Sequence, residues 1–170
     1  MRRKRTLVLT GVVLLVVALS VHAKPENAGP AEKATGSILI FEPYDDGHRE
    51  VSFNAHEAKG SRPAKGQMKD LVYDPDGNLR RTFEYDVEYV NVDGDTAYFG
   101  AQCTYDSAGT QTGKWLYVKV HDGGTPGRKG DHIGWKWGTE SEVSDWVAGG
   151  TEPPGWWRAA TDGNLVVHTK

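Results

Sequence analysis

The sequence predicts an all-β protein: a single antiparallel domain of about eight strands, forming a meander barrel or a two-layer sandwich. Three observations predict this fold class. Apolar and polar residues alternate over several short segments, as in strands that bury one face. The chain has 21 glycines and 8 prolines, and many of them lie between these segments, where turns are expected. Helical periodicity is scarce, and the short connections favour sequential antiparallel pairing over βαβ units.

Residues 1–23 have the features of a secretory signal peptide. Four cations at residues 2–5 precede an apolar run at 7–20 and the small-residue pattern Val21-His22-Ala23, which is the order found in cleaved signals. The run is shorter than the roughly 20 residues of a spanning helix, and no cysteine follows it to accept a lipid. We therefore expect no stable membrane anchor after cleavage.

Cleavage has consequences for charge and location. It removes four cations and no acid, so the formal net charge changes from −3 to −7. An acidic domain gives no electrostatic case for nucleic acid as a partner. The expected location is secreted or periplasmic, and composition does not specify the oligomeric state.

The expected domain organisation follows from the rest of the chain. Residues 24–35 are polar and predict a flexible leader, and residues 36–170 are expected to form the β-domain. Turn residues separate the strands, for example at Asp45-Asp46-Gly47 and at Asp74-Pro75-Asp76-Gly77-Asn78, which lacks the spacing of a calcium loop. The expected strands are 37–41, 51–56, 67–73, the two arms of a hairpin at 79–105, 114–121, 131–137 and 165–168.

The hairpin at 79–105 predicts its own register. Asp93-Gly94 suits a two-residue type I′ turn, which needs positive φ at both central positions. One bulge between Tyr89 and Val90 brings the apolar sides into line, since without it Glu88 would enter the core unpaired. The predicted inner pairs are Phe83 with Cys103, Tyr85 with Ala101, and Val87 with Phe99.

Residues 138–162 show no strand pattern and are expected to form a long loop. Loops of about 25 residues in a compact domain are usually functional. This one contains three tryptophans, and flat rings stack on sugar rings or apolar ligands. The alternative is that the tryptophans cap one end of the barrel or sandwich. The candidate ligand-binding residues, on this loop and on the outward face of 114–121, are Trp115, Tyr117, Trp146, Trp156 and Trp157.

One candidate metal site lies in the hairpin at 121–132. If its strands pair, His121 faces His132 and Asp122 faces Asp131, a ligand set that suits a zinc-like ion. Aspartates beside turns more often bond to their own backbone, so the sequence predicts no metal and no other cofactor. The single cysteine, Cys103, excludes an internal disulfide. Its place on an apolar strand face indicates a small buried hydrophobe rather than a catalytic thiol.

Several turn and strand motifs resemble a group of small exported bacterial β-domains of unknown function. The likeness covers residues 36–137 and 163–168, and it implies an exported all-β fold with no established activity and no catalytic residues to carry over. The tryptophan-rich segment 146–157 lies outside it. The motifs are Val51-Ser52-Phe53-Asn54-Ala55, Lys65-Gly66-Gln67, Tyr73-Asp74-Pro75-Asp76-Gly77-Asn78, Val90-Asn91-Val92-Asp93-Gly94-Asp95-Thr96-Ala97-Tyr98-Phe99 and Val120-His121-Asp122-Gly123-Gly124-Thr125-Pro126-Gly127.

The sequence favours binding over catalysis. It has no Gly-x-Ser-x-Gly elbow, no His-Glu-x-x-His and no phosphate loop. The prediction is an exported, non-enzymatic binding or structural module that uses its aromatic loop, with a glycan or an apolar small molecule as the ligand. The alternative is a hydrolase acting on extracellular polysaccharide or lipid. A cleft with a buried carboxylate or histidine near Trp156 would indicate the hydrolase, and a flat or convex aromatic patch would indicate binding.

Overall fold

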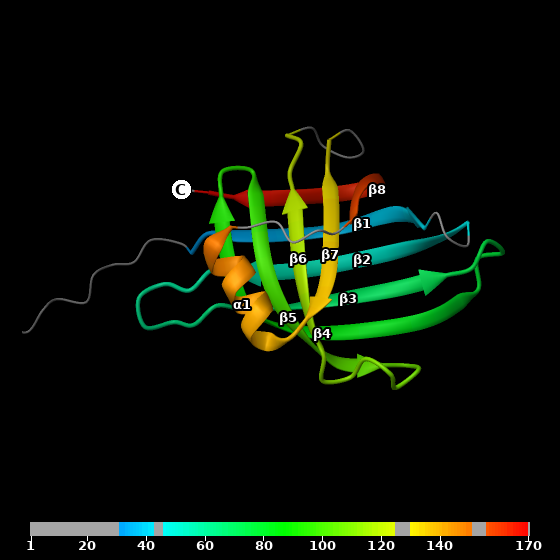
Figure 1. The fold of residues 1–170 in the computed structure, drawn as a ribbon. Helices are drawn as coiled ribbons and strands as arrows, with labels where there is room; N and C mark the ends of the chain where they lie inside the picture. The colour runs from blue at the N-terminus through cyan, green and yellow to red at the C-terminus, as the bar shows by residue number, and fades with distance from the viewer. Residues whose placement is uncertain (1–30, 43–45, 125–129, 151–155, 170) are drawn as a thin grey trace, which may run out of the picture.

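The computed structural model describes residues 31–42, 46–124, 130–150 and 156–169, and for Trp156 the backbone alone. The described residues form eight strands and one helix (Figure 1). Strands pair antiparallel in chain order, and β8 pairs with β1 to close a barrel. The predicted all-β class and meander order are confirmed, and the barrel is the correct alternative. The elements are β1 (Lys33–Glu42), β2 (Gly47–His56), β3 (Lys65–Tyr73), β4 (Leu79–Asp93), β5 (Thr96–Asp106), β6 (Trp115–His121), β7 (His132–Gly138), α1 (Glu140–Gly149) and β8 (Trp156–His168).

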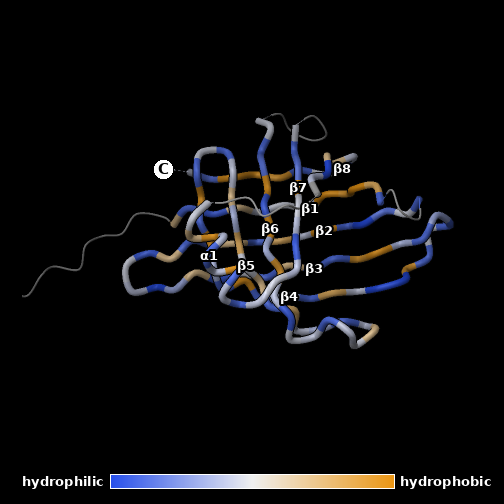
Figure 2. The backbone as a smooth tube through the Cα atoms, in the orientation of Figure 1, coloured by the Kyte–Doolittle hydropathy of each residue, from blue (hydrophilic) through white to orange (hydrophobic). Residues whose placement is uncertain are grey.

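Alternation along the strands sorts side chains between the lumen and the outer wall. Apolar and polar positions alternate along the tube in Figure 2, and the apolar ones fill the lumen. Phe53 and Phe99 meet there with ring centroids 5.4 Å apart. Each large side chain removed from water contributes roughly 1.5–3 kcal/mol, so the filled lumen is the main source of stability.

The β4–β5 hairpin keeps the predicted inward face but changes its register. The loop lies at Gly94-Asp95 rather than at Asp93-Gly94, because Asp93 still pairs with Thr96. The pairing has two irregularities instead of the one predicted. One is at Glu88, which stays exposed, and the other leaves Thr104 of β5 unpaired between Cys103 and Tyr105. The six residues expected to face inward are all buried, but the pairs differ from the prediction. Phe83 pairs with Asp106, Tyr85 with Cys103 and Val87 with Ala101.

Two predicted boundaries are corrected. The predicted signal peptide and most of the leader lie outside the described residues, but β1 already begins at Lys33, because Ala34 is buried between Ala55 and Val167. The predicted loop at 138–162 contains α1 and the start of β8. Within the described residues no helix has the length and apolar character needed to cross a membrane.

The local sequence explains where α1 begins, where it ends and which face it buries. Thr139 and Glu142 form a capping box at its start, and Gly150 ends it in the left-handed region at φ 58°. Val143 and Val147 lie one turn apart on the same face, and both are buried against the outer wall of the barrel. Gly100 on β5 allows this close approach, since a Cβ there would lie 2.6 Å from Val143 Cγ1.

The lumen has two unlike ends. Because neighbouring strands are antiparallel, one end collects the starts of the odd-numbered strands and the finishes of the even-numbered ones. This apolar end holds small and branched side chains, all buried: Ala34, Ala55, Ala97, Val120 and Leu165. The opposite, charged end holds buried or half-buried polar and aromatic side chains: Glu42, Arg49, Asp70, Trp135 and Trp137.

Candidate functional site

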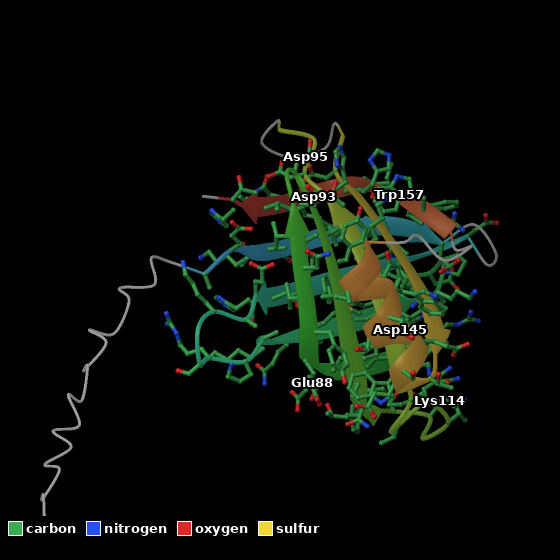
Figure 3. The ribbon with its side chains drawn as sticks, turned by 60° about the vertical axis from the view of Figure 1, so that its left-hand side comes forward. Glu88, Asp93, Asp95, Lys114, Asp145 and Trp157 are labelled. Atoms are coloured by element: carbon green, nitrogen blue, oxygen red, sulfur yellow. The ribbon has the colours of Figure 1, made fainter. Side chains whose placement is uncertain are left out.

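The outer wall of β5–β8 carries a group of half-buried side chains that we call the outer aromatic patch: Tyr98, Lys119, His132 and Trp157. Strand register brings them together. Tyr98 pairs with Lys119, Lys119 with Gly134, and Gly134 with Trp157. Since Gly134 has no side chain, Lys119 and Trp157 meet above it. Figure 3 shows Trp157 on β8, on the same side of the barrel as α1, where Asp145 is labelled.

The patch combines a cation with flat rings. Lys119 Nζ lies 4.6 Å from the Trp157 ring centroid and 5.9 Å from that of Tyr98, within the range of cation–π attraction. The rings of His132 and Trp157 are stacked, with centroids 5.4 Å apart and planes 5° from parallel. His132 Nδ1 donates to the Gly130 carbonyl at 2.7 Å, which fixes the ring orientation.

A histidine and a second lysine border the patch. The His121 ring lies 6.5 Å from that of His132, and its Nδ1 is 3.3 Å from Asp95 Oδ1. On the side nearer α1, Lys136 Nζ lies 5.2 Å from the Trp146 ring. Two lysines, Lys119 and Lys136, therefore lie among aromatic rings on this wall of a chain whose net charge is negative.

The structure divides the predicted aromatic surface. Trp115 and Tyr117 are 7% and 3% exposed because α1 covers them, so they are packing residues rather than an open platform. Trp146 is on α1 and meets Tyr117 edge-on at 5.8 Å. Trp157 belongs to the outer aromatic patch, and the side chain of Trp156 lies outside the described residues. The helix that buries the first two rings was absent from the prediction, which is why the prediction grouped all five.

The candidate metal residues do not converge. His121 does pair with His132, but both aspartates bond to backbone amides. Asp122 accepts from Gly124 N and Val167 N at 2.8 and 3.0 Å. Asp131 accepts from Gly123 N and Leu165 N at 3.0 and 2.9 Å. These carboxylates fasten the β6–β7 hairpin to β8. Over the described part of the chain, no group of three or more His, Cys, Asp or Glu side chains is placed to hold a metal ion.

Other reactive groups have structural roles. Cys103 is buried, and burial raises the pKa of its thiol, as expected for a small hydrophobe. Asp106 accepts from Arg81 and from the backbone amides of the loop that follows it. The Arg81 hydrogen bonds, helped by those amides, hold the pKa of Asp106 well below its usual range. Asp106 thus anchors the β5–β6 connection.

The prediction missed three charged residues in the lumen: Glu42, Arg49 and Asp70. Arg49 Nε lies 2.9 Å from Glu42 Oε2, and Arg49 Nη1 lies 2.7 Å from Asp70 Oδ2. The signal was present in the sequence, because each residue shares the inward phase of its strand with neighbours two positions away: Ile40, Val51, Met68 and Val72. A charged residue in that phase is rare unless it is paired.

Comparisons of the chain with protein-family models, curated proteins and solved structures find no match. No relative therefore assigns a role to a residue of the patch or of the lumen. The resemblance to exported β-domains of unknown function stays a prediction. Because a barrel fold supports many unrelated functions, function has to be argued from the chemistry of these side chains.

Proposed function

We propose that this protein is an exported, non-enzymatic binding module that holds an acidic glycan on its outer aromatic patch. The observation that carries the proposal is the Lys119 ammonium group 4.6 Å from the Trp157 ring centroid, with the His132 ring stacked on the same tryptophan. A cation beside flat rings combines two kinds of recognition in one small area.

The chemistry of the patch matches an acidic sugar. The apolar face of a pyranose ring packs on an aromatic side chain, and Trp157 and His132 supply such rings. The carboxylate of a uronic acid forms a charge-assisted hydrogen bond with an ammonium group, which Lys119 supplies. Lys136 adds a second ammonium group on the side nearer α1, as the repeating charge of a polymer requires.

The shape of the site favours binding over hydrolysis. The patch is on the convex outer wall of a closed barrel, whereas a hydrolase surrounds the bond it breaks with acid and base groups. Asp131, which directly precedes His132 in the chain, is a buried carboxylate beside the patch. Both of its oxygens accept hydrogen bonds from backbone amides. It therefore holds the hairpin in place rather than transferring protons.

Calorimetric titration of the purified chain with oligogalacturonate tests the proposal. We expect saturable binding that weakens as salt is raised, because salt screens exposed charges. Malto-oligosaccharide of equal length, which lacks carboxylates, is expected to bind at least about tenfold more weakly. Trp157→Ala should abolish binding of the acidic sugar, and Lys119→Met should reduce its affinity to that of the neutral one.

Two control variants lie elsewhere on the barrel. Tyr105→Ala removes an aromatic side chain that is 49% exposed, and Lys69→Met removes a surface cation paired with Glu84. Both should bind like the unaltered protein. Equal affinity for the acidic and neutral sugars, or unchanged binding in Lys119→Met, would contradict the proposal.

A further inference from the structure

One part of β4 extends beyond the strand that pairs with it. The ladder of β3 with β4 ends where Gly66 pairs with Val87, next to the irregularity at Glu88. β4 itself continues to Asp93. Over the described part of the chain, residues 88–93 therefore pair with β5 on one side only. We call their unpaired side the open edge.

The open edge presents backbone hydrogen-bonding groups. In an antiparallel ladder, successive residues direct their N–H and C=O groups to opposite sides of the strand. Asp93 pairs with Thr96 across the two-residue loop, so Val92 and Val90 direct these groups away from β5. Outside the strand ladders, neither valine has a backbone hydrogen bond to a described residue. Two donors and two acceptors are therefore available to an added strand.

An apolar groove of about 360 Å³ lies beside the open edge, with residues 88–91 of β4 on one side. The β2–β3 connection and α1 supply its other sides through Ala58, Pro63, Ala64, Val147 and Ala148. Side chains of a strand alternate between two faces, so a strand added at the open edge can place an apolar side chain in this groove. Backbone pairing together with a side-chain pocket is how proteins bind peptides by strand addition.

Acidic side chains flank the open edge. Glu88 is at its start and Asp93 at its end, and Figure 3 labels both on β4. Both are exposed, and neither forms an ion pair with a described residue. Two copies of the chain paired through this edge would bring these carboxylates near one another, and like charges repel across paired strands. A strand with cations near its ends would instead gain charge-assisted hydrogen bonds.

We propose that the open edge of β4 binds an extended peptide segment of another protein, with alternating apolar residues in its centre and lysine or arginine at each end. The peptide adds a strand to β4. Its backbone pairs with Val90 and Val92, one apolar side chain enters the groove, and its cations meet Glu88 and Asp93. These residues are separate from the outer aromatic patch, so the proposal does not depend on glycan binding.

Capped heptapeptides test the proposal on the unaltered chain. The probe has alternating threonine and valine in its centre and lysine at each end. One control peptide has glutamate at each end, and the other keeps the lysines but has a central proline, which interrupts a ladder. Calorimetry should give saturable binding of the probe with a dissociation constant below about 1 mM, weaker at high salt. Both controls should bind at least about tenfold more weakly.

Amide hydrogen exchange measured by NMR locates the site. Exchange at Val90 and Val92 should slow when the probe is bound, because the new backbone hydrogen bonds protect these amides. Amides in the ladder of β1 with β2 should exchange at the same rate with and without the probe.

Variants at exposed positions separate the charge from the groove. Glu88→Lys should reduce probe affinity by about tenfold or more, whereas Asp86→Lys, where β3 still pairs with β4, should change it by less than about threefold. Ala148→Trp fills the groove and should weaken binding about tenfold. Ser141→Trp adds the same ring to α1 outside the groove and should leave binding unchanged.

The proposal is overturned if the probe does not bind at about 10 mM, or if either control peptide binds as tightly as the probe. It is also overturned if exchange at Val90 and Val92 is the same in the complex, or if Glu88→Lys binds the probe like the unaltered protein. The two acids would then only keep the open edge from pairing with other copies of the chain.

Discussion

The two ends of the barrel lumen are built from the same strands but hold side chains of different character. At the apolar end, small side chains such as Ala34, Ala55 and Ala97 fill the lumen, and the buried carboxylate of Asp131 has both oxygens bonded to backbone amides. At the charged end, Glu42, Arg49 and Asp70 occupy equivalent inward positions and leave two carboxylate oxygens unsatisfied. The apolar end shows that the chain itself can satisfy a carboxylate that this barrel buries.

The difference indicates that the charged end is not a stability device. A buried ion pair seldom stabilises more than apolar residues of similar volume, and here two carboxylate oxygens lack a donor. An arrangement that stability does not require is expected to serve a function. Two variants of the cluster test this contrast, and a variant of Asp106 gives the comparison with a buried carboxylate that has all its donors.

Arg49→Met should have the largest effect. It leaves Glu42 and Asp70 buried without their cation, and breaking a buried pair in this way costs about 3–5 kcal/mol in free energy of unfolding. Urea unfolding at pH 7 measures it. Lys69→Met, which removes a cation about half exposed on the outer wall, should cost no more than about 1 kcal/mol. If Arg49→Met lowers the free energy of unfolding by less than about 1 kcal/mol, the proposed difference between the two ends is contradicted.

Asp106→Asn should have an intermediate effect, about 2 kcal/mol, because it weakens the bonds to Arg81 and to the loop amides. The pKa of Asp106 is lowered in the folded protein, chiefly by Arg81. Its stabilising contribution is therefore complete above the unfolded-state pKa of about 4 and is lost as pH falls through the lower folded-state value. Urea unfolding from pH 7 to pH 2 should show a steeper acid loss in the unaltered protein than in Asp106→Asn. Parallel curves would exclude this role for Asp106.

The triple variant Glu42→Leu, Arg49→Met and Asp70→Leu should have the smallest effect on stability, a change within about 1 kcal/mol or a gain. It makes the charged end resemble the apolar end. The same urea unfolding measures it. A large loss of stability would mean that the cluster supports the fold after all.

Local sequence predicted the strand faces well. The two-residue alternation placed Phe83, Tyr85 and Val87 in the core, and Leu116 and Val118 with them. It also held the signals of two features that the prediction missed. The capping box at Thr139 and Glu142 marks α1, and the inward phase of Arg49 marks the charged cluster.

Other features depend on distant pairing and could not be predicted in the same way. Barrel closure needs β1 to meet β8, which no local pattern fixes. The outer aromatic patch needs β8 to place Trp157 beside Gly134, and the register of β7 with β8 follows from the closed barrel. The two-residue difference in the partners of Tyr85 and Val87 arose from a loop placed one residue too early, at Asp93 rather than Gly94. The partner of Phe83 differs by three, because Thr104 adds a second irregularity.

Closure by the first and last strands also has a kinetic consequence. Thr161 Oγ1 donates to the Leu39 carbonyl across 122 positions of the chain, and β1 has no β8 partner until that far segment has emerged. Until then both β1 and β7 present unpaired strand edges, which recruit other chains. Folding of this barrel should consequently be slow for its size, and its last step, the docking of β8, is the one at which crowding by neighbouring copies would do the most harm.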